Sequence, residues 1–303
     1  MNQIKRVVIV GGTHGNELTG VHLIKKFERK PKLIERSSFE TQTLLANPKA
    51  HENGKRYVDT DLNRCFRRQY LANYSLSSYE AQRAKVIYQT FGTGGRLEAN
   101  FVVDLHSTTA NMGLTIILGS KNSFNLRLAA YLSYVNPSVK VLYSPLRNED
   151  SPYLDSICKL GCTIEVGAVA QGVLNARLFQ QTEELVREIL DYLEAYNKGM
   201  PLEIGDSLIV YQYIQAIDYP RNESGEIRAM IHPQLQFRDY EALHPGDKMF
   251  LTFDGEEIAY CSSSTGYPVF INEAAYYEKG IAMSITQPLK IKRANQELEF
   301  LIS

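Results

Sequence analysis

A short apolar run at residues 7–10 leads directly into the glycine-containing segment 11–17, and a helix-like pattern follows at residues 18–26. β-Branched runs of this length predict buried strands, and glycines between two periodic segments predict a tight loop. The same alternation recurs along the chain: strands are predicted at residues 101–104, 114–118, 139–143 and 162–166, and helices at residues 78–91 and 182–196. Strands that alternate with helices indicate an α/β fold for the first two thirds of the chain.

The pattern changes near residue 200, where Gly199 and Pro201 end the last long helical stretch. Beyond this point no long helix is evident, and short strands are predicted at residues 207–214, 229–231, 250–253 and 256–260. The turn Asp254-Gly255 is a strong hairpin signal between the last two. We therefore expect a main domain at residues 1–200 and a smaller β-rich domain at residues 201–303.

Composition narrows the class of protein. The 303 residues carry a net charge of about −1, which gives no reason to expect a nucleic-acid or membrane partner. The four cysteines form no Cys-x-x-Cys pair and predict free thiols in a reducing compartment. The first residues run into a strand without the pattern of a signal peptide, and no apolar stretch is long enough to cross a bilayer. We expect a soluble cytoplasmic protein; the sequence does not decide whether it forms a homo-oligomer.

The segment after the first predicted strand contains His14 and Glu17, and His106 follows a later predicted strand. Ligands of open α/β sheets gather at the carboxyl ends of strands, so the three side chains can meet. Two histidines and a glutamate form the ligand set of a catalytic zinc site, which leaves one position open for water. Asp104 could orient one of these ligands. The alternative is a glycine-rich turn in which Glu17 merely complements a helix dipole.

Two further clusters add chemistry to this site. Asn63-Arg64 suits a carboxylate clamp, because a guanidinium binds both oxygens, and Arg56 could stabilise an oxyanion. Glu165 ends the apolar run 162–164, where burial would raise its pKa toward that of a general base. The alternatives are a solvated loop with paired arginines and a glutamate that faces solvent. Together the clusters predict metal-assisted hydrolysis of an amide whose substrate carries a free carboxylate.

Long motifs in this order resemble the aspartoacylase family. They are Gly11-Gly12-Thr13-His14-Gly15-Asn16-Glu17-Leu18-Thr19-Gly20, Asp61-Leu62-Asn63-Arg64, Asp104-Leu105-His106, Ile164-Glu165-Val166-Gly167, Gln171-Gly172-Val173-Leu174, Tyr219-Pro220-Arg221, Leu243-His244-Pro245-Gly246-Asp247 and the run from Tyr267 to Lys279. The resemblance covers nearly the whole chain. It implies a fold similar to zinc carboxypeptidases, with a mixed sheet flanked by helices and a β-rich C-terminal domain.

The resemblance also implies roles at matching positions. One zinc ion per chain would be held by His14, Glu17 and His106, and Glu165 would be the catalytic glutamate. The substrate-contacting residues would be Arg56, Asn63, Arg64 and Tyr276, the last from the second domain, which would thus contribute to the substrate cleft. The implied reaction is the hydrolysis of N-acetyl-L-aspartate to acetate and L-aspartate.

One position departs from the family pattern. Aspartoacylases of the mammalian type carry an arginine ten residues before the catalytic glutamate, whereas this chain has Asp155. An acidic residue there should repel a second substrate carboxylate. Either Arg147 or Lys159 takes over, or the substrate is a neutral or aromatic N-acetyl amino acid, as in the related aminoacylase. Two further alternatives for the function are a peptidase and a non-catalytic zinc-dependent binding protein.

Overall fold

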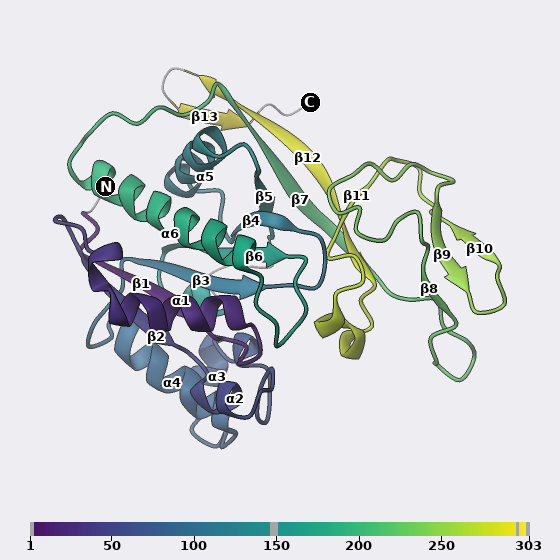
Figure 1. Ribbon diagram of the computed structural model, residues 1–303, viewed down its shortest axis with the longest axis horizontal. Helices are drawn as coiled ribbons and strands as arrows, with labels where there is room; N and C mark the ends of the chain where they lie inside the picture. The colour runs from purple at the N-terminus through teal and green to yellow at the C-terminus, as the bar shows by residue number, and fades with distance from the viewer. Residues whose placement is uncertain (1–2, 146–150, 295–296, 301–303) are drawn as a thin grey trace.

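The computed structural model describes residues 3–145, 151–294 and 297–300. Within these ranges one mixed sheet of ten strands forms the centre of the molecule (Figure 1). From one edge, its strands are β2 (Glu40–Leu45), β1 (Arg6–Gly11), β3 (Phe101–Ser107), β6 (Leu160–Gly167), β4 (Gly113–Leu118), β5 (Val139–Tyr143), β7 (Ser207–Ile217), β12 (Met283–Ala294) and β11 (Tyr267–Val269), with β13 (Glu297–Phe300) also paired to β12.

Helices cover both faces of this sheet. One face carries α1 (Leu18–Arg29), α5 (Ser123–Val135) and α6 (Ala176–Asn197), whose apolar sides form the larger core with the strands. The other face carries α4 (Tyr79–Phe91), with α3 (Arg68–Ala72) beside it and α2 (Pro48–Glu52) directly after β2. Alternate side chains of β1 enter the two cores, as expected for a strand buried on both faces: Val7 and Ile9 pack on one side, Val8 and Val10 on the other.

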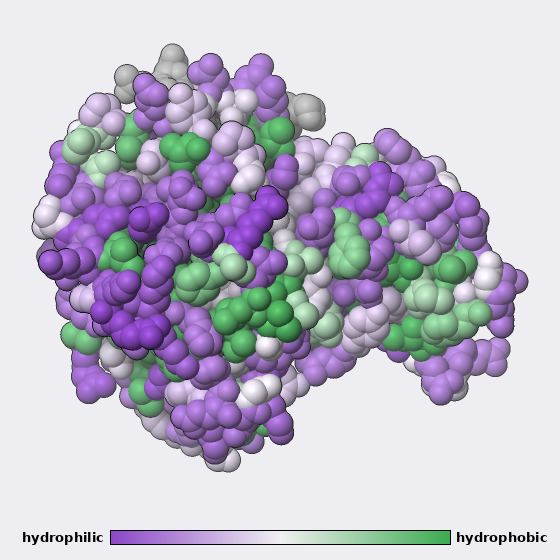
Figure 2. Space-filling model, viewed as in Figure 1, coloured by the Kyte–Doolittle hydropathy of each residue, from purple (hydrophilic) through white to green (hydrophobic). Residues whose placement is uncertain are grey.

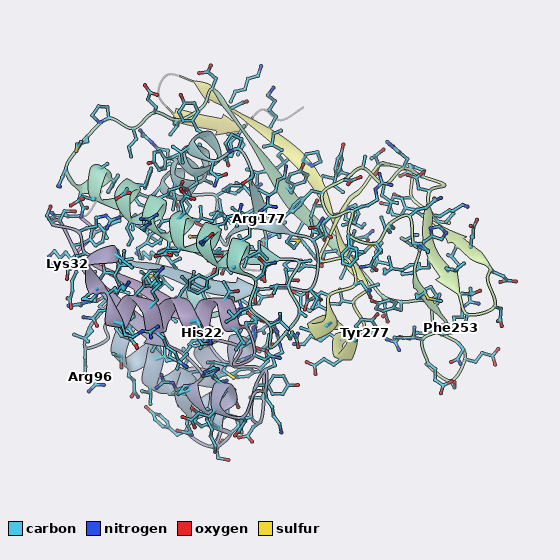
Figure 3. All side chains as sticks on the ribbon, viewed as in Figure 1. His22, Lys32, Arg96, Arg177, Phe253 and Tyr277 are labelled. Atoms are coloured by element: carbon cyan, nitrogen blue, oxygen red, sulfur yellow. The ribbon has the colours of Figure 1, made fainter. Side chains whose placement is uncertain are left out.

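The chain beyond residue 200 contributes to two sheets. β7 and β12 extend the large sheet through the pairing of β7 with β5, whereas β8 (Ala229–Ile231), β9 (Lys248–Thr252) and β10 (Glu257–Ala259) form a separate antiparallel sheet. This small sheet lies in a lobe beside the main body (Figures 1 and 2). Phe253 lies far out in the lobe and Tyr277 near its junction with the main body (Figure 3). The hairpin predicted at Asp254-Gly255 joins β9 to β10.

The predicted architecture, a mixed sheet flanked by helices with a β-rich C-terminal part, is confirmed. The strands β2, β11, β12 and β13 and the helices α2, α3 and α5 were not predicted from the sequence. β2 is a half-buried edge strand with four polar residues, and α5 buries apolar residues around much of its circumference, so neither shows a clear apolar period. No helix in the described ranges is both long enough and apolar enough to cross a membrane.

A close backbone approach fixes the loop that follows β1. The backbone N–H of Gly15 donates to Arg56 O at 3.0 Å, and a Cβ at Gly15 would overlap backbone atoms of Ala50 and His51. Only glycine fits here, because neighbouring backbone atoms cannot give way as a flexible side chain can. The contact joins the loop of His14 to the segment that carries Arg56.

We expect Gly15→Ala to destabilise the protein by about 1–3 kcal/mol, the usual cost of inserting a methyl group into a packed region. The thermal unfolding midpoint measures this effect. Gly205→Ala is the matched control, because a Cβ there would meet its nearest atoms at 3.6 Å, an ordinary contact. Equal midpoints for the two variants would contradict the close approach.

Candidate metal centre and active site

The register of three neighbouring parallel strands places the candidate site. β1 pairs with β3 up to Gly11 and Leu105, so the loop after β1 lies beside the carboxyl end of β3. β3 pairs in turn with β6, and His106 lies opposite Glu165 in that pairing. Residues that are about 90 and 60 positions apart in the sequence therefore meet at one edge of the sheet, where ligands of open α/β sheets bind.

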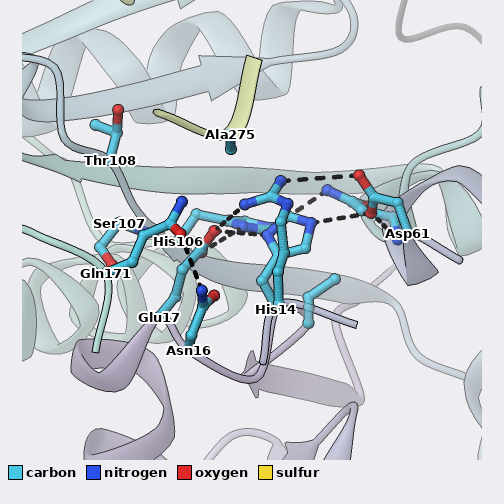
Figure 4. A network of polar contacts seen from close by, with 12 residues as sticks. His14, Asn16, Glu17, Asp61, His106, Ser107, Thr108, Gln171 and Ala275 are labelled. Carbon is cyan, nitrogen blue, oxygen red and sulfur yellow. Dashed lines mark hydrogen bonds and ion pairs between the residues drawn. The ribbon is translucent and has the colours of Figure 1, made fainter. Parts of the chain in front are cut away.

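His14, Glu17 and His106 form a buried group whose potential ligand atoms all lie within 4.8 Å of one another (Figure 4). The two oxygens of Glu17 face the two imidazoles: Oε1 lies 2.6 Å from Nδ1 of His14, and Oε2 lies 2.9 Å from Nδ1 of His106. Arg56 Nη1 and the backbone N–H of Ser107 also donate to Glu17, at 2.9 and 3.1 Å. The structure therefore brings together the three predicted ligands.

The outer nitrogen of each imidazole faces a second carboxylate. Asp61 Oδ1 lies 3.0 Å from Nε2 of His14, and Asp104 Oδ2 lies 2.8 Å from Nε2 of His106. Carboxylates in this position fix the tautomer of a ligating histidine and leave the opposite nitrogen free to bind a metal. The role expected for Asp104 matches its position, while the role of Asp61 was missed because its partner lies 47 residues away.

The charges of this group depend on one another. Burial alone would raise the pKa of Glu17, but the two histidines hold it well below its usual value. Burial would lower the pKa of His106, but Asp104 and Glu17 raise it well above the usual value. The raised pKa of His106 favours its cationic form, which offsets part of the charge of the buried carboxylates around it. Two imidazole nitrogens aimed at both oxygens of one carboxylate fit a divalent cation with nitrogen and oxygen ligands, such as zinc.

Arg56, Asn63 and Arg64 all line the same cavity of about 160 Å³. Arg56 has a buried Nε without a hydrogen-bond partner in the described part of the chain, so it can still donate to a ligand. The guanidinium of Arg64 stacks on the ring of Tyr153, 4.8 Å from its centroid. Asn63 Oδ1 accepts from the backbone N–H of Leu154 at 2.8 Å, which orients its amide group.

Glu165 lines this cavity too. Burial raises its pKa to about 8; Glu17 and Glu273 contribute in the same direction, and the cationic form of His106 opposes them. A bound cation would favour the ionised form for the same electrostatic reason. A carboxylate in this environment can take up and release a proton near neutral pH, which is what a general base requires.

A short segment from the C-terminal part covers the cavity. The 3₁₀ helix Ala274–Lys279 places Tyr276 and Lys279 in the cavity wall, and Tyr276 packs against Phe270. The buried carboxylate of Glu273 holds this helix in place, because it accepts hydrogen bonds from Thr108 Oγ1 and, at 2.7 Å, from the backbone N–H of Thr109.

Tyr276 was expected at the cavity from the sequence. Lys279 and Glu273 were missed, although both belong to the run from Tyr267 to Lys279 that resembles the family.

Asp155 is not among the described residues that line the cavity. It is buried in the 3₁₀ segment Leu154–Ile157, where its carboxylate accepts a hydrogen bond from Thr163 Oγ1 at 3.1 Å. The expectation that it faces a substrate carboxylate is therefore wrong: its short side chain ends at the strand beside it.

Lys159 was one of two cations expected to bind the second substrate carboxylate instead. It is exposed and precedes β6, roughly 20 Å along the strand from Glu165 at about 3.3 Å per residue, so it cannot bind that carboxylate. Arg147 lies outside the described residues.

Residues 3–193 match the succinylglutamate desuccinylase/aspartoacylase catalytic domain, and residues 206–288 match the AstE/AspA barrel-sandwich hybrid domain. The chain belongs to the succinylglutamate desuccinylase/aspartoacylase family. A probable aspartoacylase from Nostoc sp. is 59% identical over 287 residues, which cover 95% of this chain and 97% of that protein. The predicted family is thus confirmed.

Other similar proteins carry a different name. The N-acyl-aromatic-L-amino acid amidohydrolase (carboxylate-forming) of Mus musculus is 41% identical, over 94% of this chain and 91% of its own. The crystal structure of murine aminoacylase 3 matches with a TM-score of 0.92 at 37% identity, over 99% of this chain and 100% of that one. These names support a hydrolase that acts on small N-acyl amino acids.

We expect Asp104→Asn to weaken zinc binding about 10- to 100-fold, because a neutral amide no longer holds the tautomer of His106. Competition with a chelator measures the affinity, and His106→Ala is the reference for loss of a ligand. Asp239→Asn is the control: Asp239 is also buried, but it accepts from the backbone of Asn111 and Ile271. An unchanged affinity in Asp104→Asn would contradict the proposed metal geometry.

Proposed function

We propose that the chain is a zinc-dependent amidohydrolase that removes the acyl group of an N-acyl-L-amino acid, with N-acetyl-L-aspartate as its substrate. The observation that supports the proposal is the pairing of β3 with β6, in which Glu165, the candidate proton acceptor, lies opposite the candidate metal ligand His106. When bound at His14, Glu17 and His106, zinc would lower the pKa of a water molecule and polarise the acyl carbonyl.

The side chains of the cavity supply the remaining steps. Glu165 accepts a proton from the attacking water at its carboxylate and then delivers it to the leaving amine nitrogen. Arg56 donates to the oxygen on which negative charge develops at the former carbonyl. The chain's own groups thus account for both proton transfers and for part of the charge stabilisation.

A free α-carboxylate on the substrate fits the clamp at Asn63 and Arg64. The guanidinium of Arg64 can bind both carboxylate oxygens, and its stacking on Tyr153 limits its motion. The amide nitrogen of Asn63 lies 3.3 Å from Nε2 of His106, but that nitrogen faces Asp104, so the amide hydrogens remain available to a ligand. This clamp favours an N-acyl amino acid over the interior of a peptide.

Lys279 supports a dicarboxylate substrate. It lines the cavity with its side chain 30% exposed, and its closest acidic partner, Asp61 Oδ2, lies at the rather long distance of 3.5 Å. With Arg64 on the α-carboxylate and Arg56 at the acyl oxygen, Lys279 is the cation that remains, among the described residues of the cavity wall, for a side-chain carboxylate. The name of the Nostoc relative agrees with this assignment.

A neutral or aromatic side chain is the second candidate, and a specific observation favours it. Part of the cavity wall is apolar; this part consists of Ile117, Leu142, Val269, Phe270 and Ile281. Burial of an aromatic ring against such a surface is favourable, whereas a carboxylate there would lose its hydration. The murine amidohydrolase, named for aromatic substrates, agrees with this second candidate.

Glu165→Gln should keep the fold and about one zinc ion per chain, but lose about 10²- to 10⁴-fold in kcat, because an amide cannot accept the proton of water. Elemental analysis and steady-state kinetics provide the two readouts. Glu188→Gln, on the outer helix α6, is the control for loss of a glutamate with a raised pKa. Normal turnover by a zinc-loaded Glu165→Gln would place the base elsewhere, and an inactive wild type would favour a binding protein.

Lys279→Met separates the two substrate candidates. Loss of a charge-assisted contact should lower kcat/KM for N-acetyl-L-aspartate about 10- to 100-fold relative to N-acetyl-L-tyrosine, while methionine keeps the apolar stem. Lys248→Met is the control, because Lys248 pairs with Glu257 in the outer lobe. If the wild type cleaves only the tyrosine derivative, the second candidate is correct.

A further inference from the structure

The segment from Arg56 to Arg64 carries most of the polar groups that would meet the substrate, yet residues 57–61 belong to no helix or strand. Arg56, Asn63 and Arg64 line the cavity, and Asp61 orients His14. A segment outside the regular elements needs other partners for its buried backbone groups, and without them it would not hold side chains in one position.

One carboxylate supplies those partners. Glu80, in the first turn of α4, has no exposed surface. Its Oε1 accepts from the backbone N–H of Val58 at 2.6 Å, and its Oε2 accepts from the backbone N–H groups of Asp59 and Thr60 at 3.0 and 3.1 Å. Three successive N–H groups of the irregular segment thus converge on a single side chain.

Two neighbouring contacts complete the arrangement. Asn47 Nδ2 donates to Glu80 Oε1 at 3.1 Å, so this anion has four donors. In return, Asp59 Oδ2 accepts from the backbone N–H of Tyr79 at 2.7 Å, at the start of α4. Backbone N–H groups of the segment thus donate to a side chain of α4, and a backbone N–H group of α4 donates to a side chain of the segment. A buried carboxylate is costly unless it is hydrogen-bonded, so Glu80 strongly favours this one conformation of the segment.

We propose that Glu80 is a positioning residue for the substrate clamp: its carboxylate holds residues 58–60 and thereby sets the places of Arg56 on one side and of Asn63 and Arg64 on the other. Glu80 is not among the described residues of the cavity wall, and its hydrogen bonds go to Asn47 and to residues 58–60 rather than to the candidate metal ligands. The inference rests on the proposed function, because it concerns recognition of the α-carboxylate of an N-acyl amino acid.

The expected defect follows from the geometry. Glu80→Gln keeps the shape but places an NH₂ group where a carboxylate oxygen accepted backbone N–H groups, so at least one of these donors loses its partner. Displacement of a clamp by about 1 Å can cost up to about 100-fold. We expect binding of substrates with a free α-carboxylate to weaken about tenfold or more, while zinc content stays near one per chain, because the three candidate ligands lie outside this segment.

The test compares ligands that differ only in the α-carboxylate: N-acetyl-L-tyrosine with its α-carboxamide, and N-acetyl-L-aspartate with its α-carboxamide. Binding to the zinc-loaded protein is measured by calorimetry in a Glu165→Gln background, where the ligands are not consumed. The background protein should prefer each carboxylate to its carboxamide. Adding Glu80→Gln should reduce that preference about tenfold or more, and KM in the otherwise wild-type protein should rise by a similar factor with a smaller change in kcat.

Two further variants keep the result interpretable. Glu183→Gln is the matched control, because Glu183 is also buried but pairs with Lys26 on the outer side of the sheet; it should leave the preference unchanged. Asp59→Asn weakens the reciprocal contact at an exposed residue and should show the same loss to a smaller degree, so it decides the matter if Glu80→Gln does not fold.

The outcomes separate this inference from the proposed function. An unchanged carboxylate preference in folded Glu80→Gln, or in Asp59→Asn if it alone folds, overturns the role of Glu80 and leaves the proposed function intact. An equal loss for carboxylate and carboxamide together with loss of zinc also overturns it, because Glu80 would then be a purely structural residue. If the background protein binds none of the four ligands, the proposed function itself fails, and the inference fails with it.

Discussion

The buried carboxylate of Glu17 is the group on which the rest of the site depends. It receives contacts from four directions: the imidazoles of His14 and His106, the guanidinium of Arg56 and the backbone N–H of Ser107. An isolated anion at this depth would be strongly unfavourable, so these segments must meet for the fold to tolerate it. The same requirement assembles a set of nitrogen and oxygen atoms suited to a divalent cation. One arrangement thus both compensates the buried charge of Glu17 and provides the candidate metal ligands.

Other buried carboxylates organise the site in a similar way, and all but Asp104 do so by joining segments that are distant in sequence. Asp61 and Asp104 hold the outer nitrogens of the two histidines, Glu80 holds the irregular segment 58–60, and Glu273 joins the covering 3₁₀ helix to the loop after β3. Charge-assisted hydrogen bonds are stronger and more directional than neutral ones, which suits them to fixing loops. The regular elements set the architecture, and these anions set the positions of the loops between them.

The sequence could predict what is encoded locally. His14 and Glu165 follow or end apolar runs, so their places at strand ends could be inferred from periodicity, and the family resemblance added the fold. Partners of Glu80 lie about 20 residues away and in irregular backbone, where no period exists to identify them. Asp155 shows the limit most clearly: its spacing from Glu165 was read correctly, but spacing does not reveal that the side chain turns toward Thr163.

The covering helix, Ala274–Lys279, has a consequence for how the protein matures. The candidate metal ligands and Glu165 are all present once the chain has been synthesised to the end of α6, whereas this helix lies nearly 80 residues later, just before β12. Domains tend to fold from the N-terminus as the chain emerges. A growing chain can therefore assemble its reactive centre well before the part that encloses it. Enclosure has to wait for the synthesis of this helix, which comes just before β12, the strand that pairs with β7.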